Sequence, residues 1–308
     1  MRANATAAAI AARDFGHGLL LPRGAAAAAP ALIYQSPSSR VAIQRRQLVH
    51  VAVPTTGHNA RITGDRDLRD GWLVRTPIAH RGLHAANDGR PENSLAAFDR
   101  ACAHGFPAEL DVRLTRDGEV AVFHDRTLRR LTGASGRVED RAAAELRPLR
   151  LLGTDQRVPM LSEVLELVAG RVPLLIELKA GAPPTALEVA VLAALRGYAG
   201  EVAIQSFELR TVRELDRREA PHAVGHLWHR RTLADTGDRV AFVGCHVDGA
   251  PRRAVQRRRA AGSVVLAWTV RSPEQAERAL RYVDNYIFEG FVPEHAVSAP
   301  RSAAAASR

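Results

Sequence analysis

The feature that most constrains the fold is a repeated alternation, from residue 77 onward, of short apolar runs with longer amphipathic segments. Short apolar runs are typical of buried strands, and the segments between them have the apolar spacing of helices with one buried face. Eight strand-like runs lie at residues 78–80, 108–114, 120–123, 174–178, 202–207, 223–228, 241–247 and 264–270. Helices are expected at residues 94–103, 161–168, 185–195, 209–218, 252–260 and 273–282. This order indicates parallel strands joined by right-handed crossovers.

The number of strands favours a (β/α)₈ TIM barrel, a fold of about 250 residues. A doubly wound open sheet is the alternative, but no Gly-x-Gly-x-x-Gly follows the first run, so a dinucleotide-binding fold has little support. One link is too short for a crossover helix, between Asp111 and His124. Asp117-Gly118 in its middle is typical of a two-residue hairpin turn. We therefore predict a distorted barrel with a hairpin-like link between strands 2 and 3, in which Asp111 lies opposite His124.

Composition divides the chain into three parts. Residues 1–70 are rich in Ala, Arg, Ser and Thr and poor in acids, which predicts a disordered extension, with a transit-like leader as the alternative. No convincing signal peptide is present, so we expect a cytoplasmic protein. The barrel domain is predicted over residues 71–296 and a disordered tail over 297–308.

The charge and the apolar content limit the classes of partner. The net charge is +10, but residues 71–300 hold 32 basic and 29 acidic side chains, without a basic stripe. This distribution argues against a nucleic-acid partner. No apolar run is long enough for stable membrane insertion. Cys102 and Cys245 are too few for a cysteine-based metal site.

Charged and imidazole side chains occur where buried parallel strands should be apolar. They stand near the carboxyl ends of the first four runs: His80, Arg81, Glu109, Asp111, His124, Glu177 and Lys179. Active sites of eight-stranded barrels are built at this rim. Residues two apart share a strand face, so Glu109 lies beside Asp111, and Glu177 beside Lys179.

The residue types at this rim point to phosphoryl chemistry. Three carboxylates, Glu109, Asp111 and Glu177, are oxygen ligands of the kind that suits Mg²⁺ or Ca²⁺. His80 and His124 can act as acid and base near neutral pH. Arg81 and Lys179, the only lysine of the chain, suit a phosphoryl group. Any one of these residues could be structural, but seven on consecutive strands indicate a site.

These residues carry a resemblance. The chain resembles the glycerophosphodiester phosphodiesterase family in order from about residue 77 to 290. The matching segments are IAHRG at 78–82, PENSLAAF at 91–98, AELDVRLTRDGEVAVFHDRTLRRLTG at 108–133, LLIELK at 174–179, QSF at 205–207 and AWTV at 267–270.

The resemblance implies cation-dependent hydrolysis of a small phosphodiester to glycerol 3-phosphate and an alcohol on a distorted barrel. It implies that Glu109, Asp111 and Glu177 bind the metal, that His80 and His124 are the acid–base pair, and that Arg81 and Lys179 bind phosphate. Glu92 would support the site through hydrogen bonds, and Trp268 would form either an apolar pocket wall or part of the core. Asn93 or Ser94 would cap the next helix.

A phospholipase D-like or phosphatidylinositol-cleaving activity on lipids is the alternative function. Only 5 % of the residues are aromatic and the rim loops are polar, which favours a water-soluble headgroup. The resemblance weakens at three places. The loop 82–91 is long, segment 126–158 is expected to fold as little more than a helix, and NYIFEGFVP lacks the Ile-Thr-Asp-like ending expected for the last strand.

Overall fold

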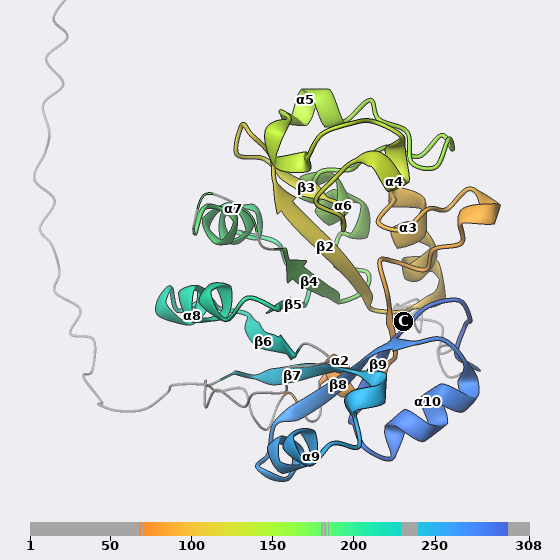
Figure 1. Ribbon diagram of the computed structural model, residues 1–308, viewed down its shortest axis with the longest axis vertical. Coiled ribbons are helices and arrows are strands. Elements are labelled where there is room, and N and C mark those ends of the chain that lie inside the picture. Colours follow the sequence, from red (N-terminus) through yellow and green to blue (C-terminus); the bar gives the residue numbers. More distant parts are fainter. Residues whose placement is uncertain are drawn as a thin grey trace, which may run out of the picture. The chain divides into compact units, whose positions relative to one another are not determined.

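The computed structural model describes residue 68 and residues 71–179, 181, 183, 185–228 and 240–294 (Figure 1). The predicted extension, apart from Leu68, and the predicted tail at 297–308 lie outside these residues. Within the described part, no helix has the length and apolar character needed to cross a membrane.

A closed barrel of parallel strands forms the centre of the described part. Strand β1 (Ile78–Ala79) pairs with both β2 and β9, and this pairing closes the sheet. The other barrel strands are β2 (Ala108–Leu114), β4 (Leu174–Leu178), β5 (Val202–Ser206), β6 (Ala223–Trp228), β7 (Phe242–His246), β8 (Val264–Val270) and β9 (Asn285–Phe288). The predicted TIM barrel is confirmed. Its eighth strand is β9, which lies outside the eight runs counted from the sequence.

The run at 120–123 forms the hairpin instead. Strand β3 (Val120–Val122) pairs antiparallel with the C-terminal half of β2, whereas β1 pairs with β2 at Ala108. The hairpin was predicted, but its register was wrong by one residue, because Val112 pairs with Val122. Thr115 N donates to Glu119 O at 2.9 Å, which leaves a three-residue loop ending on Gly118 at φ +87°. Asp111 therefore faces Phe123, and His124 lies just beyond the pairing.

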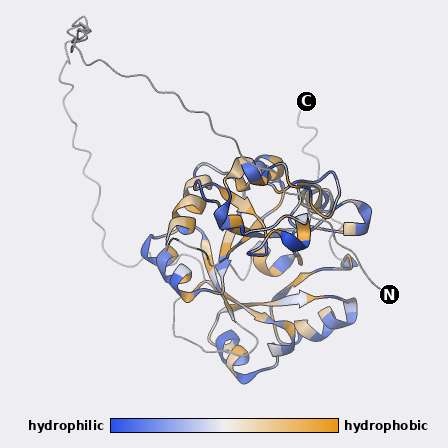
Figure 2. Cartoon of the chain, turned by 45° about the horizontal axis from the view of Figure 1, so that its top comes forward, coloured by the Kyte–Doolittle hydropathy of each residue, from blue (hydrophilic) through white to orange (hydrophobic). Residues whose placement is uncertain are grey.

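Helices cover the outside of the barrel close to the expected positions (Figure 1). They are α3 (Leu95–His104), α6 (Leu161–Val168), α7 (Ala186–Ala194), α8 (Leu209–Arg217), α9 (Arg253–Ala260) and α10 (Pro273–Leu280). Ser94 caps α3 by accepting from Ala97 N at 3.2 Å, so it is the cap of the two residues considered. Figure 2 shows apolar residues gathered on the strands and inner helix faces, with polar residues outside.

Short α2 (Trp72–Arg75) packs on the strands from the amino-terminal side of the barrel. Its Leu73 is buried in a cluster with residues such as Ile78 and Phe242. Asn285 Nδ2 donates to Leu73 O at 2.9 Å and to Thr76 O at 2.7 Å, which ties α2 to β9. With this end filled, the opposite, carboxyl end of the strands remains for a site.

Segment 126–158 is more elaborate than the single helix expected. It contains α4 (Arg129–Thr132), a 3₁₀ turn η2 (Val138–Asp140) and α5 (Ala143–Leu146). Ten buried residues of this segment and its neighbours form a core separate from the barrel cores: Ala121, Phe123, Leu128, Leu131, Val138, Ala143, Leu146, Leu151, Val158 and Met160. The segment was underestimated because its apolar residues are spread over turns, where no helical or strand period reveals them.

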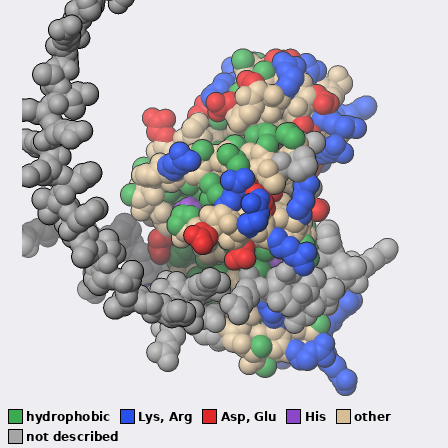
Figure 3. All heavy atoms as spheres, turned by 90° about the vertical axis from the view of Figure 1, so that its left-hand side faces the viewer, with side chains coloured by type: hydrophobic (Ala, Val, Ile, Leu, Met, Phe, Trp, Pro, Cys, Tyr) green, Lys and Arg blue, Asp and Glu red, His purple; other side chains and the backbone are tan. Residues whose placement is uncertain are grey.

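On the molecular surface that Figure 3 shows, acidic side chains lie among the basic ones.

Candidate active site

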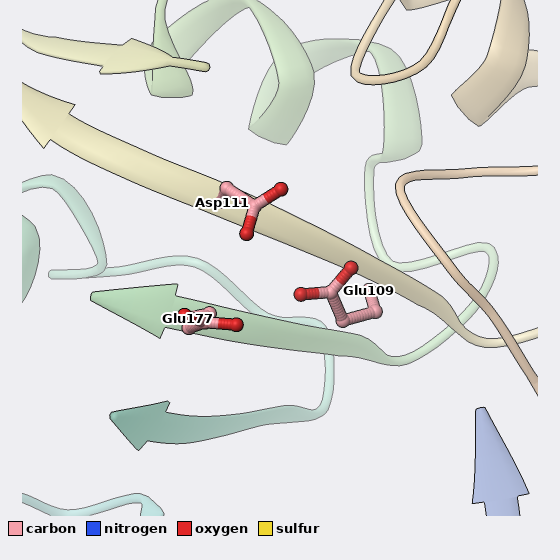
Figure 4. A group of neighbouring side chains, drawn as sticks. All are labelled: Glu109, Asp111 and Glu177. Carbon is pink, nitrogen blue, oxygen red and sulfur yellow. The ribbon is translucent and has the colours of Figure 1, made fainter. Parts of the chain in front are cut away.

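Three carboxylates from β2 and β4 lie close together (Figure 4). Glu177 is near the carboxyl end of β4, as expected, but Asp111 is in the middle of β2 and Glu109 is its second residue, because β2 continues beyond the barrel into the hairpin. Glu109 and Asp111 come from β2 and Glu177 from β4, where Asp111 and Glu177 are in register. One oxygen from each residue lies within 4.8 Å of the others, and their exposed fractions are 1 %, 0 % and 6 %. The structure thus brings together the three residues that the sequence pattern singled out as metal ligands.

The carboxylates have strongly perturbed pKa values. Burial and the nearby Asp111 and Glu177 raise the pKa of Glu109 well above its usual value. Burial raises the pKa of Glu177 to about 7, against the opposing effect of Lys179. Burial also acts to raise the pKa of Asp111, but Lys179 and Arg81 outweigh it, and the net shift is downward. Three ionised acids would outnumber the two cationic neighbours, Arg81 and Lys179, and the raised pKa values mean that Glu109 and Glu177 tend to keep a proton when no cation is bound.

This arrangement fits a divalent cation. Asp111 Oδ1 is buried and accepts no well-oriented hydrogen bond, although Lys179 Nζ lies 2.8 Å away. Carboxylate oxygens are hard ligands, and a bound cation would relieve the repulsion that raises the pKa of Glu109 and Glu177. The described residues contain no second group of three or more such ligands.

Arg81 lies against the carboxylates through both its backbone and its side chain. Its backbone N donates to Glu109 Oε2 at 3.0 Å, and its Nε lies 3.3 Å from Asp111 Oδ2. Arg81 has φ +54°, and the following Gly82 has φ +76° and no room for a Cβ beside Ala97. The chain can make this tight turn against α3 because residue 82 is glycine.

Asn93 holds Asp111 from the other side. Its Nδ2 donates to Asp111 Oδ2 at 2.8 Å, and its Oδ1 accepts from Asp111 N at 3.3 Å. Asn93 is buried and has φ +57°, a conformation that asparagine tolerates better than most residues. The sequence pattern offered Asn93 or Ser94 as the helix cap; Ser94 is the cap, and the contact of Asn93 with Asp111 was not foreseen.

Lys179 points its ammonium group at the acids. Its Nζ contacts Glu177 Oε1 and lies 2.8 Å from Asp111 Oδ1. Burial acts to lower its pKa, but Asp111 and Glu177 raise it overall, so Lys179 is charged. A compact ammonium fits between two carboxylates in a buried space where a planar guanidinium would need more room.

Each of the two histidines has a carboxylate oxygen beside its Nδ1. His80 Nδ1 is 2.6 Å from Glu289 Oε2, and His124 Nδ1 is 2.7 Å from Asp125 Oδ1. His80 Nε2 lies 3.9 Å from Glu109 Oε2. Burial is the main cause that lowers the pKa of both imidazoles. His124 directly follows Phe123, whose backbone N donates to Asp111 O at 2.9 Å, and the charge of Asp111 opposes the lowering of the pKa of His124.

A chain of charges connects His124 to Arg81. Arg130 Nε donates to Asp125 Oδ2 at 2.6 Å, and its two terminal nitrogens donate to the two oxygens of Glu92 at 2.7 Å. Arg81 Nη1 donates to the same Glu92 at 2.6 Å. Glu92 therefore accepts hydrogen bonds from both Arg81 and Arg130. Arg113 fixes the backbone of the loop, because its Nε and Nη2 donate to His124 O at 3.0 and 2.8 Å.

Trp268 is half-buried at the far side of the barrel mouth. Its ring packs edge-on against Phe207 at 5.3 Å and against His246 at 5.2 Å between centroids. Lys179 Nζ lies 6.0 Å from the centroid of Phe207. Lys179 therefore contacts the carboxylates on one side and lies near Phe207, the neighbour of Trp268, on the other. This position of Trp268 is compatible with both a pocket wall and a packing role.

Four residues of the site were not singled out by the sequence pattern in these roles: Asn93, Asp125, Arg130 and Glu289. Asp125 directly follows His124, and Glu289 directly follows the last strand, so their positions beside strand ends were visible signals. Neither lies on a strand face, and strand periodicity therefore could not give their direction.

Comparison with known proteins identifies the family of the chain. Residues 80–288 match the model of the glycerophosphoryl diester phosphodiesterase family. A glycerophosphodiester phosphodiesterase of Caldanaerobacter subterraneus is 37 % identical over 158 residues, which are 47 % of this chain and 63 % of the relative. A probable glycerophosphodiester phosphodiesterase 2 of Mycobacterium tuberculosis is 33 % identical over 65 % of this chain and 81 % of its own length.

Solved structures share the fold. A glycerophosphodiester phosphodiesterase of Thermotoga maritima superposes with a TM-score of 0.58 at 27 % identity, over 69 % of this chain and 94 % of that one. An Oleispira antarctica phosphodiesterase, solved with its product sn-glycerol-3-phosphate, gives a TM-score of 0.64 at 24 % identity, over 70 % and 93 %. The chain belongs to the glycerophosphoryl diester phosphodiesterase family. It spans 63 % and 58 % of the length of two of its curated relatives.

Proposed function

We propose that this protein hydrolyses glycerophosphodiesters to glycerol 3-phosphate and an alcohol, with a divalent cation, Mg²⁺ or Ca²⁺, held by Glu109, Asp111 and Glu177. The observation that carries the proposal is the buried carboxylate cluster with the imidazole of His80 beside Glu109, and with His124 directly after Phe123, the residue whose backbone N donates to Asp111 O. Membership of the family adds the class of substrate.

The side chains have distinct roles in this proposal. A bound cation would polarise the phosphoryl group and offset its negative charge. Arg81 and Lys179 would contact phosphoryl oxygens. One imidazole would accept the proton of the attacking hydroxyl, and the other would donate a proton to the oxygen of the departing alcohol.

The attacking hydroxyl would be the neighbouring hydroxyl of the substrate's own glycerol. Its oxygen would form a new bond to phosphorus while the bond to the alcohol oxygen breaks, which gives a cyclic phosphate. Water would then open the ring, with the two imidazoles exchanging roles, and glycerol 3-phosphate would leave. Burial lowers the pKa of both histidines, which favours the neutral imidazole that the base requires, and the histidine that acts as the acid would react from its protonated form.

A direct comparison of substrates tests the proposal. With added Mg²⁺ or Ca²⁺, we expect glycerophosphocholine and glycerophosphoethanolamine to release glycerol 3-phosphate, measured by coupled oxidation of the product. Lysophosphatidylcholine would give a lysophosphatidic acid and choline, and we expect it to react much more slowly than glycerophosphocholine when choline release is measured for both. A rat relative, 38 % identical over 102 residues, is named a lysophospholipase D, so preference for the lysolipid would instead favour the lipid alternative.

Lys179 provides a sharper test of phosphate binding. Lys179→Arg retains the charge but spreads it over a planar group beside Asp111 and Glu177. We expect turnover to fall about 10²-fold, since a displacement of about 1 Å in a reacting group can have this effect. Cation binding, followed by calorimetry, should persist. Parental turnover in Lys179→Arg would mean that Lys179 serves only to neutralise the acids.

A further inference from the structure

Glu289 stands at the end of the strand whose sequence departs from the family pattern. It directly follows β9 (Asn285–Phe288), and its backbone N donates to Val270 O at 3.0 Å. His80 directly follows β1, the neighbouring strand, and its backbone N donates to Phe288 O at 2.9 Å. Two rigid strand ends therefore place this carboxylate and this imidazole side by side.

The two oxygens of Glu289 serve different partners. Oε2 lies 2.6 Å from His80 Nδ1, and His84 Nε2 lies 3.8 Å from the same oxygen. Oε1 accepts from Arg271 Nε at 2.8 Å and lies 2.6 Å from Arg271 Nη2. Arg271 thus binds one carboxylate oxygen of Glu289, and the other oxygen points toward His80. The side chain of Glu289 is 20 % exposed, and it is not one of the metal-cluster acids.

An ionised carboxylate at Nδ1 determines the state of the ring. It accepts a hydrogen bond only if Nδ1 carries a proton, and this leaves the lone pair of the neutral imidazole on Nε2. In His80 that nitrogen lies 3.9 Å from Glu109 Oε2, on the side of the carboxylate cluster. The contact therefore selects both the tautomer and the direction of the ring.

We infer that Glu289 is a positioning residue that acts through His80, with Arg271 orienting its carboxylate. The inference rests on the proposed function, because it requires His80 to exchange protons with the reacting groups. It also explains the unusual IFEG ending, because the glutamate takes the place of the expected strand-end residue and reaches His80 from the end of β9. Asp125 makes the corresponding contact with His124, so each imidazole has a carboxylate at Nδ1.

Kinetics of the cation-loaded full-length enzyme test this role. We expect Glu289→Ala to lower kcat on the order of 10–100-fold with little change in KM, as is typical for loss of a group that orients an imidazole. Glu289→Gln should lose less, because its amide oxygen can still accept from Nδ1. Glu277→Gln, a change of an exposed glutamate on α10, is the matched control and should behave like the parent. In a His80→Ala background, Glu289→Ala should cost nothing further.

Nitrogen NMR of labelled protein gives a readout independent of turnover. In the parent, the neutral His80 ring should carry its proton on Nδ1, and in Glu289→Ala the Nε2-protonated form should dominate. Loss of turnover in His80→Ala with none in Glu289→Ala, or an Nε2 proton in the parent, would overturn the positioning role alone. Full turnover in His80→Ala would overturn the proposed role of His80 and that of Glu289 with it.

Discussion

Removal of divalent cations is expected to abolish hydrolysis, and Mg²⁺ or Ca²⁺ should restore it. Without a cation, the ionised acids of the cluster would repel one another and an anionic phosphodiester, and only Arg81 and Lys179 would oppose this charge. Turnover of glycerophosphocholine should be measured after dialysis against EDTA and again after each cation is added. Full turnover in a preparation verified to be metal-free would contradict the assignment of Glu109, Asp111 and Glu177.

Two variants make this test specific. Asp111→Asn keeps the shape of the side chain but removes a charge and should weaken cation binding, followed by calorimetry. Glu188→Gln is the matched control, because Glu188 is also a buried acid but accepts from Thr211 on α8, away from the cluster. Its cation affinity should equal that of the parent.

Cation affinity should also depend on pH in a defined direction. In the cation-free protein the pKa of Glu177 is about 7, above its usual value, so Glu177 is largely protonated below that pH. A cation must displace this proton, and affinity should therefore rise as the pH increases through about 7. The pKa of Glu177 is raised from 4.5 to about 7 by burial and by Asp111, so ionising Glu177 in the cation-free fold is unfavourable. The stability of this fold should therefore fall as the pH rises from the ordinary glutamate pKa to about 7, and level off above it. An unchanged cation affinity between pH 6 and pH 8, about one unit on each side of the pKa of Glu177, would contradict this prediction.

The charged residues on strand faces could be predicted from sequence because their direction follows from a period of two. Glu109 and Asp111, two apart on a buried strand, had to share a face, and a buried pair of acids requires a cation or partner. The same logic gave Glu177 and Lys179. The order of strands and helices predicted parallel strands, and the count of eight runs favoured a closed barrel, although it included the hairpin run at 120–123 and missed β9.

Residues outside the regular elements could not be placed in this way. The hairpin register depended on whether Asp117-Gly118 forms a two- or a three-residue loop, which the sequence leaves open. Asn93 reaches Asp111 through a left-handed backbone conformation, and Glu289 reaches His80 from a strand end nearly the whole domain away in sequence. Such contacts arise from tertiary packing, and no local period encodes them.

Replacement of either histidine is expected to lower turnover by at least about 10²–10⁴-fold, the range for general acid–base catalysis. His80→Ala and His124→Ala should leave the fold and cation binding intact, since neither side chain belongs to the carboxylate cluster. The double variant should lose much less than the product of the two single losses, because both groups serve one transition state. His104→Ala, at the end of α3, is the control and should retain parental turnover.

The leaving group can then separate the two roles. A glycerophosphodiester of p-nitrophenol releases an anion that needs no proton, so the variant that lacks the acid should recover much of its turnover on this substrate. The variant that lacks the base should not recover, because the attacking hydroxyl must still lose its proton. His80 and His124 have the same kind of carboxylate partner at Nδ1, so the structure leaves the choice between them to this measurement. Parental turnover in either single variant would show that its imidazole is structural, and equal recovery in both would contradict a division into one acid and one base.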